Sequence, residues 1–243
     1  MRKVGTVFGV IAGIVLIGIT AFLGYVWFAG GDGTPSEEVS APTLVAEDNQ
    51  QVYRIDKEQS TVQFFLREDL SGVRTDVIGT TSEVAGDILV DFNNPSNSSV
   101  GTIRVNARTL ETDRSMRNRQ IRSFILESAS DEYEFINFEP TDVLNFPEVP
   151  EIGEELQFQI VGDLTIKNTT QSEVWDATVT LVSEDRMEGV ATTTVSRGDY
   201  NLNIPNVSSV ANVDEEVQLT IKFVALAVDL ETTAATDEIV DTQ

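Results

Sequence analysis

Apolar and polar side chains alternate along short runs in the middle of the chain, between residues 51 and 229. In residues 60–68, Val62, Phe64 and Leu66 share one face of an extended chain, and the residues between them share the other. Because a β-strand turns successive side chains to opposite faces, this period of two predicts half-buried strands. Runs of the same kind occupy residues 83–92, 100–107, 133–143, 155–168, 172–182, 187–196 and 216–226.

Segments rich in Asn, Pro, Gly, Ser and charged residues separate these runs. They occupy residues 93–99, 146–155, 167–171 and 183–186, and their compositions are typical of turns. Eight or more short strands joined by turns predict an all-β fold, either an antiparallel barrel or a sandwich. Residues 111–132 do not alternate, so we expect an irregular or short helical insertion there.

The chain begins with a long apolar run. Arg2 and Lys3 are followed by residues 4–31, in which there is no charged side chain. About 20 helical residues cross a hydrocarbon core of about 30 Å, so we predict a transmembrane signal-anchor helix over residues 4–28. A cleaved signal peptide is the alternative, but its apolar region is typically only about 7–15 residues long.

Charges beside this run predict its orientation and the organisation of the chain. By the positive-inside rule, we expect a single-pass cell-membrane protein in which residues 1–3 are cytoplasmic. The domain that follows the helix is expected to be extracytoplasmic. Gly, Pro, Ser and acidic residues predict a flexible acidic stalk over residues 29–50 and a flexible acidic tail over residues 230–243. Residues 51–229 form the predicted β-domain between them.

Composition narrows the function classes. The 243 residues include 16 basic and 40 acidic side chains, for a net charge of −24, so nucleic acid is not an expected partner. The chain has no His and no Cys, which removes the usual general base near neutral pH and the commonest transition-metal ligands. We therefore predict a protein that is not an enzyme and has no catalytic residue and no metal site. A carboxylate-based enzyme is the least favoured alternative.

Six segments follow one another in an order that is specific to one protein family. Their sequences are VYRIDKEQSTVQFFLRE (52–68), VIGTTSEVAGDILVDF (77–92), SMRNRQIRSFIL (115–126), YEFINF (133–138), VGDLTIKNTTQSEVWDATV (161–179) and VSRGDYNLNIPN (195–206). Over essentially all of residues 51–229, the chain thereby resembles the YceI-like polyisoprenoid-binding family. Gln59 and Glu68 stand where that family often has His, and Asn118 where it often has Asp.

The resemblance implies a lipocalin-like antiparallel β-barrel of about eight strands that holds a long isoprenoid chain in its lumen. It implies binding without catalysis, with an isoprenoid lipid or a quinone as ligand and no other cofactor. The expected function is that of a membrane-anchored extracytoplasmic carrier or reservoir for this lipid. The alternative is an envelope module for protein–protein contact, in which side chains fill the barrel. Pattern alone does not separate an open lumen from a filled one.

The lumen would be lined by the apolar faces of the predicted strands. Burial of a methylene group is worth about 0.8 kcal/mol, so an apolar tunnel binds a lipid chain without special polar chemistry. Ordinary core packing is the alternative role for each lining residue. The candidates are Phe64, Leu66, Val84, Ile88, Ile136, Phe138, Phe158, Ile160, Leu164, Trp175, Val179, Leu219, Ile221 and Phe223.

Arginine is concentrated in one part of this acidic chain. Residues 104–122 contain six Arg and only two acids, Glu111 and Asp113, so the segment has a local charge of +4. Because Arg matches the geometry of phosphate, Arg117 and Arg122 are the candidates for contact with a lipid head group, if the lipid carries a phosphate. The alternative is that these Arg side chains pair with the abundant carboxylates.

Overall fold

The strands follow the alternating runs of the sequence. The computed structural model describes residues 33–47, 49–145 and 151–228, and within them one 13-stranded sheet forms. The predicted all-β fold is confirmed. The strands are β1 (Gln50–Ile55), β2 (Thr61–Leu70), β3 (Val73–Thr81), β4 (Val84–Ala85), β5 (Asp87–Asp91), β6 (Ser99–Val100), β7 (Ile103–Asn106), β8 (Phe135–Leu144), β9 (Glu155–Ile166), β10 (Thr169–Ser183), β11 (Arg186–Ser196), β12 (Val210–Ala211) and β13 (Glu216–Ala227).

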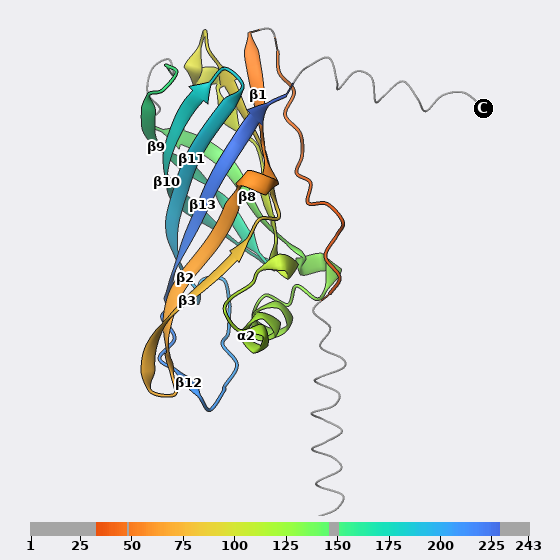
Figure 1. The fold of residues 1–243 in the computed structure, drawn as a ribbon, viewed down its shortest axis with the longest axis vertical. Coiled ribbons are helices and arrows are strands. Elements are labelled where there is room, and N and C mark those ends of the chain that lie inside the picture. The colour runs from red at the N-terminus through yellow and green to blue at the C-terminus, as the bar shows by residue number, and fades with distance from the viewer. Residues whose placement is uncertain (1–32, 48, 146–150, 229–243) are drawn as a thin grey trace, which may run out of the picture.

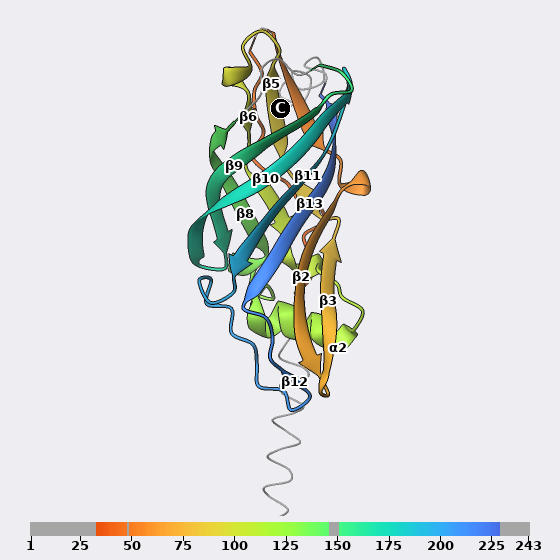
Figure 2. The same ribbon diagram turned by 90° about the vertical axis from the view of Figure 1, so that its left-hand side faces the viewer.

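The sheet is strongly curled and forms a half-barrel of lipocalin-like type (Figures 1 and 2). Strands β8, β9, β10, β11 and β13 are neighbours in that order, and their pairings are antiparallel. The C-terminal end of β13 pairs with β1, and the preceding part of β13 pairs with β2. The 3₁₀ turn η1 (Lys57–Gln59) separates β1 from β2. Strand β5 pairs with β1 and β4 pairs with β7, with only Gly86 between β4 and β5.

The expected insertion after β7 is helical. It contains η3 (Ala107–Thr109), the short helix α2 (Ser115–Gln120), the π-type turn η4 (Ile121–Ile125) and η5 (Asp131–Tyr133), and a further 3₁₀ turn, η2 (Pro95–Asn97), precedes β6. Figure 2 shows α2 at the end of the sheet where the β2–β3 hairpin projects. Two backbone hydrogen bonds of 2.8 and 2.9 Å join Thr80 of β3 to Glu111, so the insertion is attached to the β3 edge.

Residues 33–47, here called the strap, lie along the outside of the sheet. The backbone N–H and the hydroxyl of Ser36 donate to Glu134 at 2.7 and 3.0 Å, and the N–H of Leu44 donates to Asp87 at 3.0 Å. These bonds attach residues 33–47 to the rest of the domain, while the flexibility predicted for residues 29–50 stays a prediction. The composition of the segment is that of a linker, but side chains far away in the sequence supply partners for its backbone.

Other predicted segments lie outside the described residues. These are the transmembrane helix over residues 4–28 and the tail over residues 230–243. Within residues 33–47, 49–145 and 151–228, the structure has no helix of the length and apolar character that crossing a membrane requires.

Glu134 is the buried centre of the strap's attachment. Its carboxylate accepts hydrogen bonds from Arg108 Nη1 at 2.9 Å and from Asn106 Nδ2 at 2.8 Å, in addition to those from Ser36. Burial acts to raise the pKa of Glu134, but the hydrogen bonds from Ser36 and Asn106 and the charge of Arg108 outweigh it. The pKa of Glu134 is therefore lowered from its ordinary value of 4.5.

The lowered pKa predicts that acid weakens the attachment of the strap. Because the folded pKa lies below the unfolded one, ionised Glu134 stabilises the fold fully above the unfolded pKa, and this contribution is lost as the pH falls through the folded pKa. The melting temperatures of the protein and of Glu134→Gln should differ by about 2–4 °C at about pH 7, and this difference should shrink as the pH falls below 4.5.

Asp131→Asn is the matched control for this experiment. Asp131 also pairs with Arg108, at 2.6 Å, but its side chain is 97% exposed, so its removal should change the melting temperature little at any pH. A Glu134→Gln difference that stays the same from about pH 7 to well below pH 4.5 would contradict the assigned role of the ionised carboxylate.

Candidate functional site

The inward side chains of the curled sheet enclose two cavities. The first, of about 390 Å³, lies between β2, α2, η4 and the loop of residues 197–209, and is called the α2 cavity. The second, of about 810 Å³, lies between β5, β9, β10 and β11, and is called the β5 cavity. Cavities of this size fall within the range of small-molecule sites in proteins, roughly 300–1,000 Å³.

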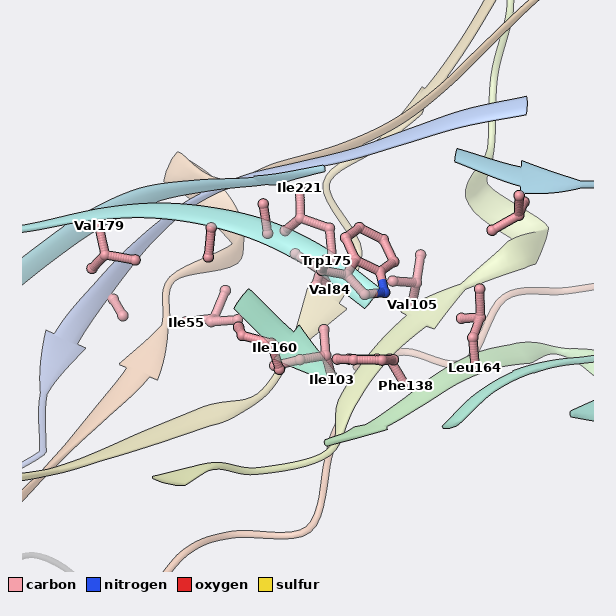
Figure 3. Packing of buried hydrophobic residues seen from close by; sticks show 14 of the residues in the cluster. Ile55, Val84, Ile103, Val105, Phe138, Ile160, Leu164, Trp175, Val179 and Ile221 are labelled. Atoms are coloured by element: carbon pink, nitrogen blue, oxygen red, sulfur yellow. The ribbon is translucent and has the colours of Figure 1, made fainter. Parts of the chain in front are cut away.

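The two cavities meet at one level of the interior. Four buried side chains line both of them: Ile103, Phe138, Trp175 and Ile221, here called the waist (Figure 3). The rings of Phe138 and Trp175 are in contact, with centroids 5.5 Å apart and planes inclined at 51°. Side chains of this kind offer dispersion contacts and no charge, so the boundary between the cavities is apolar.

The structure places 13 of the 14 predicted lumen residues on the wall of a cavity. Strand alternation therefore identified the inward face of the sheet, while contact with a ligand stays a prediction. The α2 cavity includes Phe64, Leu66, Ile136, Leu164 and Leu219, the β5 cavity includes Ile88, Phe158, Ile160, Val179 and Phe223, and the waist includes Phe138, Trp175 and Ile221.

Val84 is the exception among the predicted lumen residues. It lies on the two-residue strand β4, opposite Val105 of β7, and is 1% exposed. It lines neither cavity and is part of the packed core, where neighbouring side chains cover it. Ordinary core packing, the alternative role for each candidate, is its role in the structure.

One wall of the α2 cavity was missed by the sequence analysis. Leu202, Ile204, Pro205 and Val207, from the loop between β11 and β12, line this cavity. The loop contains a signal that could have found them, because Asn residues separate its apolar residues much as polar residues do along a strand.

A buried ion pair supplies the charged groups in the α2 cavity wall between β2 and α2. Arg117 Nη2 lies 2.8 Å from Glu68 Oε1, and their side chains are 11% and 9% exposed. Arg117 also pairs with Asp113, whose side chain is 67% exposed. Both Arg117 and Glu68 line the cavity, as do Arg114 and Arg197. Arg114 pairs with Asp113 at 3.5 Å and Arg197 with Glu215 at 2.7 Å, so every Arg in the wall has a carboxylate partner.

Arg122, the second predicted head-group residue, lines neither cavity. Its Nε donates to the carbonyl oxygen of Leu110 at 3.0 Å, and its Nη2 lies 3.5 Å from Glu111. Arg117 lines a cavity, but two carboxylates already match its charge. The pairing of Arg with acids, the alternative interpretation of this Arg-rich segment, thus describes both side chains.

The cavity-lining strands coincide with a known domain. A model of the YceI-like domain matches residues 53–225. The chain belongs to the YceI-like domain family. No curated protein sequence matches the chain significantly.

Two solved structures share the fold of this YceI-like chain. A polyisoprenoid binding domain from Saccharophagus degradans, implicated in plant cell wall breakdown, is 15% identical, with a TM-score of 0.56 over 72% of this chain and 98% of that chain. BcnA from Burkholderia cenocepacia is 18% identical, with a TM-score of 0.53 over 70% of this chain and 98% of that chain. At these identities the similarity shows the fold.

The ion pair of the α2 cavity predicts strong coupling between its two residues. Arg117→Gln leaves the carboxylate of Glu68 buried without its main partner and should lower the free energy of unfolding by about 3 kcal/mol. The double variant with Glu68→Gln removes both charges and should recover most of this loss. Denaturant unfolding of the two single variants and the double variant measures the coupling.

Asp113→Asn is the control for this pair, because it removes the exposed partner of Arg117 and should change the stability by no more than about 0.5 kcal/mol. If the losses of the two single variants simply add up in the double variant, Arg117 and Glu68 are not coupled and the prediction is wrong.

Proposed function

We propose that this YceI-like protein holds a long isoprenoid-type lipid in its two adjacent cavities and shields it from water, as a carrier or reservoir. The observation that carries the proposal is that two cavities of about 390 and 810 Å³ lie next to each other and share four buried apolar wall residues. A long chain that passes the waist would be surrounded by apolar side chains on both sides of it. Each methylene group buried there contributes about 0.8 kcal/mol to binding.

The fold supports an isoprenoid as the chain. The domain from Saccharophagus degradans that shares this fold is described as polyisoprenoid binding. A branched, flexible chain suits an interior in which a narrow aromatic level separates two wider spaces, because its methyl groups fill irregular space on either side. The proposal for this chain is accordingly binding, with no catalytic step.

Charge favours a neutral polar end on the lipid. Arg117, which lines the α2 cavity, is already paired with Glu68 and Asp113, so a phosphate would compete with two carboxylates. The other Arg residues of this cavity are paired as well, Arg114 with Asp113 and Arg197 with Glu215. The whole chain has a net charge of −24, which repels anions at long range. A neutral isoprenoid lipid therefore fits better than a phosphorylated one.

The extraction of native protein tests the proposal. Mass spectrometry of the organic extract should detect a long-chain isoprenoid in stoichiometric amount, mainly without phosphate. A protein that carries no lipid and takes up none when isoprenoids are added would contradict the proposal and favour a module for protein–protein contact.

Variants of the β5 cavity link the lipid to the interior. Val179→Trp places a large ring in this cavity and should shorten the bound chain or reduce its amount, whereas Phe158→Ala enlarges the cavity and should admit longer chains. Val174→Trp is the matched control, because Val174 is on the same strand, β10, and is 47% exposed. Equal lipid content and chain length in all three folded variants would exclude the lumen as the site.

The proposal includes a location at the outer face of the cell membrane, with residues 4–28 as the anchor. Ser36 of the strap is fixed to Glu134. Seven residues, 29–35, separate this point from the proposed anchor, and an extended chain spans at most about 3.6 Å per residue. Ser36 would then remain within about 29 Å of the end of the anchor, which keeps the attached part of the domain close to the source of its lipid.

An uncleaved anchor has a direct consequence in native membranes. The protein should resist extraction with alkaline carbonate, and mass spectrometry of its N-terminal peptide should find Met1 or Arg2, because the apolar run has a poor cleavage site at its end. A mature N-terminus near residue 30 would contradict the anchor and leave the lipid-binding proposal unaffected.

A further inference from the structure

The waist contains a buried hydrogen-bond donor that has no acceptor. Trp175 is 3% exposed, and its Nε1 has no hydrogen-bond partner among the described residues. A buried indole N–H normally has an acceptor, because the loss of water is costly when nothing replaces it. A donor that stays unpaired at the junction of two cavities indicates that the molecule filling them supplies the acceptor.

The position of the nitrogen assigns it to one cavity. Figure 3 shows the indole nitrogen of Trp175 directed toward Val105, which lines the α2 cavity and not the β5 cavity. The other waist side chains, Ile103, Phe138 and Ile221, are hydrocarbon and accept no hydrogen bond. The N–H group is therefore the polar feature of an otherwise apolar level of the interior.

We infer that Trp175 donates a hydrogen bond to a neutral oxygen of the bound lipid, a carbonyl or hydroxyl group located in the α2 cavity. The inference rests on the proposed function and defines the polar end of the ligand. An ionised group is unsuited to this place, because the waist provides one weak donor and no cation, and the Arg side chains that line the α2 cavity are each paired with a carboxylate.

This contact also gives the lipid a direction. With its oxygen beside Trp175 in the α2 cavity, the apolar chain extends through the waist into the larger β5 cavity, of about 810 Å³. Trp175 thus acts as a specificity-determining residue, since it favours lipids that carry a neutral oxygen over hydrocarbons of the same length.

A matched pair of isoprenoids tests the inference on the delipidated full-length chain. Farnesol carries a hydroxyl group and farnesene does not, and farnesyl diphosphate is the charged member of the series. Trp175→Phe keeps an aromatic ring at the waist but removes the N–H, so it should weaken farnesol binding by about tenfold and leave farnesene binding unchanged or tighter. Trp27→Phe, at the other Trp in the sequence, should alter neither affinity.

A second measurement does not depend on the folding of the variant. In ¹⁵N-labelled protein, the indole N–H resonance of Trp175 should move downfield when farnesol binds and much less when farnesene binds. Equal weakening of farnesol and farnesene by Trp175→Phe, with no difference in the resonance, would overturn the inference and leave lipid binding in place. Preferred binding of farnesyl diphosphate that Trp175→Phe does not affect would also overturn it. Failure of all three isoprenoids to bind the unaltered chain would instead remove the proposed function and, with it, this inference.

Discussion

The packing of Phe138 against Trp175 determines how the interior of this protein is used. A curled sheet of long strands surrounds more space than its inward side chains fill, and these two rings, with Ile103 and Ile221, close that space at a single level. The result is two adjacent cavities with a shared apolar boundary. Protein interiors are ordinarily close-packed, so cavities of this size on both sides of the waist are unusual for a core that is filled by side chains alone.

Polar contacts assemble the end of the molecule around the α2 cavity. Strand β3 lies at an edge of the sheet, and the insertion is joined to it by backbone hydrogen bonds between Thr80 and Glu111. Two buried ion pairs, Arg117–Glu68 and Arg108–Glu134, then fix α2 and the strap. In a chain this rich in acids, the Arg residues of the insertion stabilise the structure by pairing with carboxylates. Such pairs are formed by Arg108, Arg114, Arg117 and Arg122.

The sequence predicted the inward face of the sheet well, because period-two alternation is a local property of each strand. On β9 and β10, for example, Ile160, Leu164 and Val179 all line a cavity as expected. Contacts between distant segments were not predictable in this way. Arg117 pairs with Glu68, which is 49 residues away in the sequence. Ser36 of the strap donates a hydrogen bond to Glu134, which is 98 residues away. For the same reason, composition did not reveal the hydrogen bonds that attach residues 33–47 to Glu134 and Asp87.

Contacts from one bound lipid to both cavities test the account most directly. Isotope-filtered nuclear Overhauser spectra of the loaded protein can detect ligand protons near the methyl groups of Leu164 in the α2 cavity and of Val179 in the β5 cavity. The account predicts contacts at both residues from a single isoprenoid molecule bound at a ratio of one to one. Contacts at surface residues alone, with none at Leu164 and Val179, would contradict it.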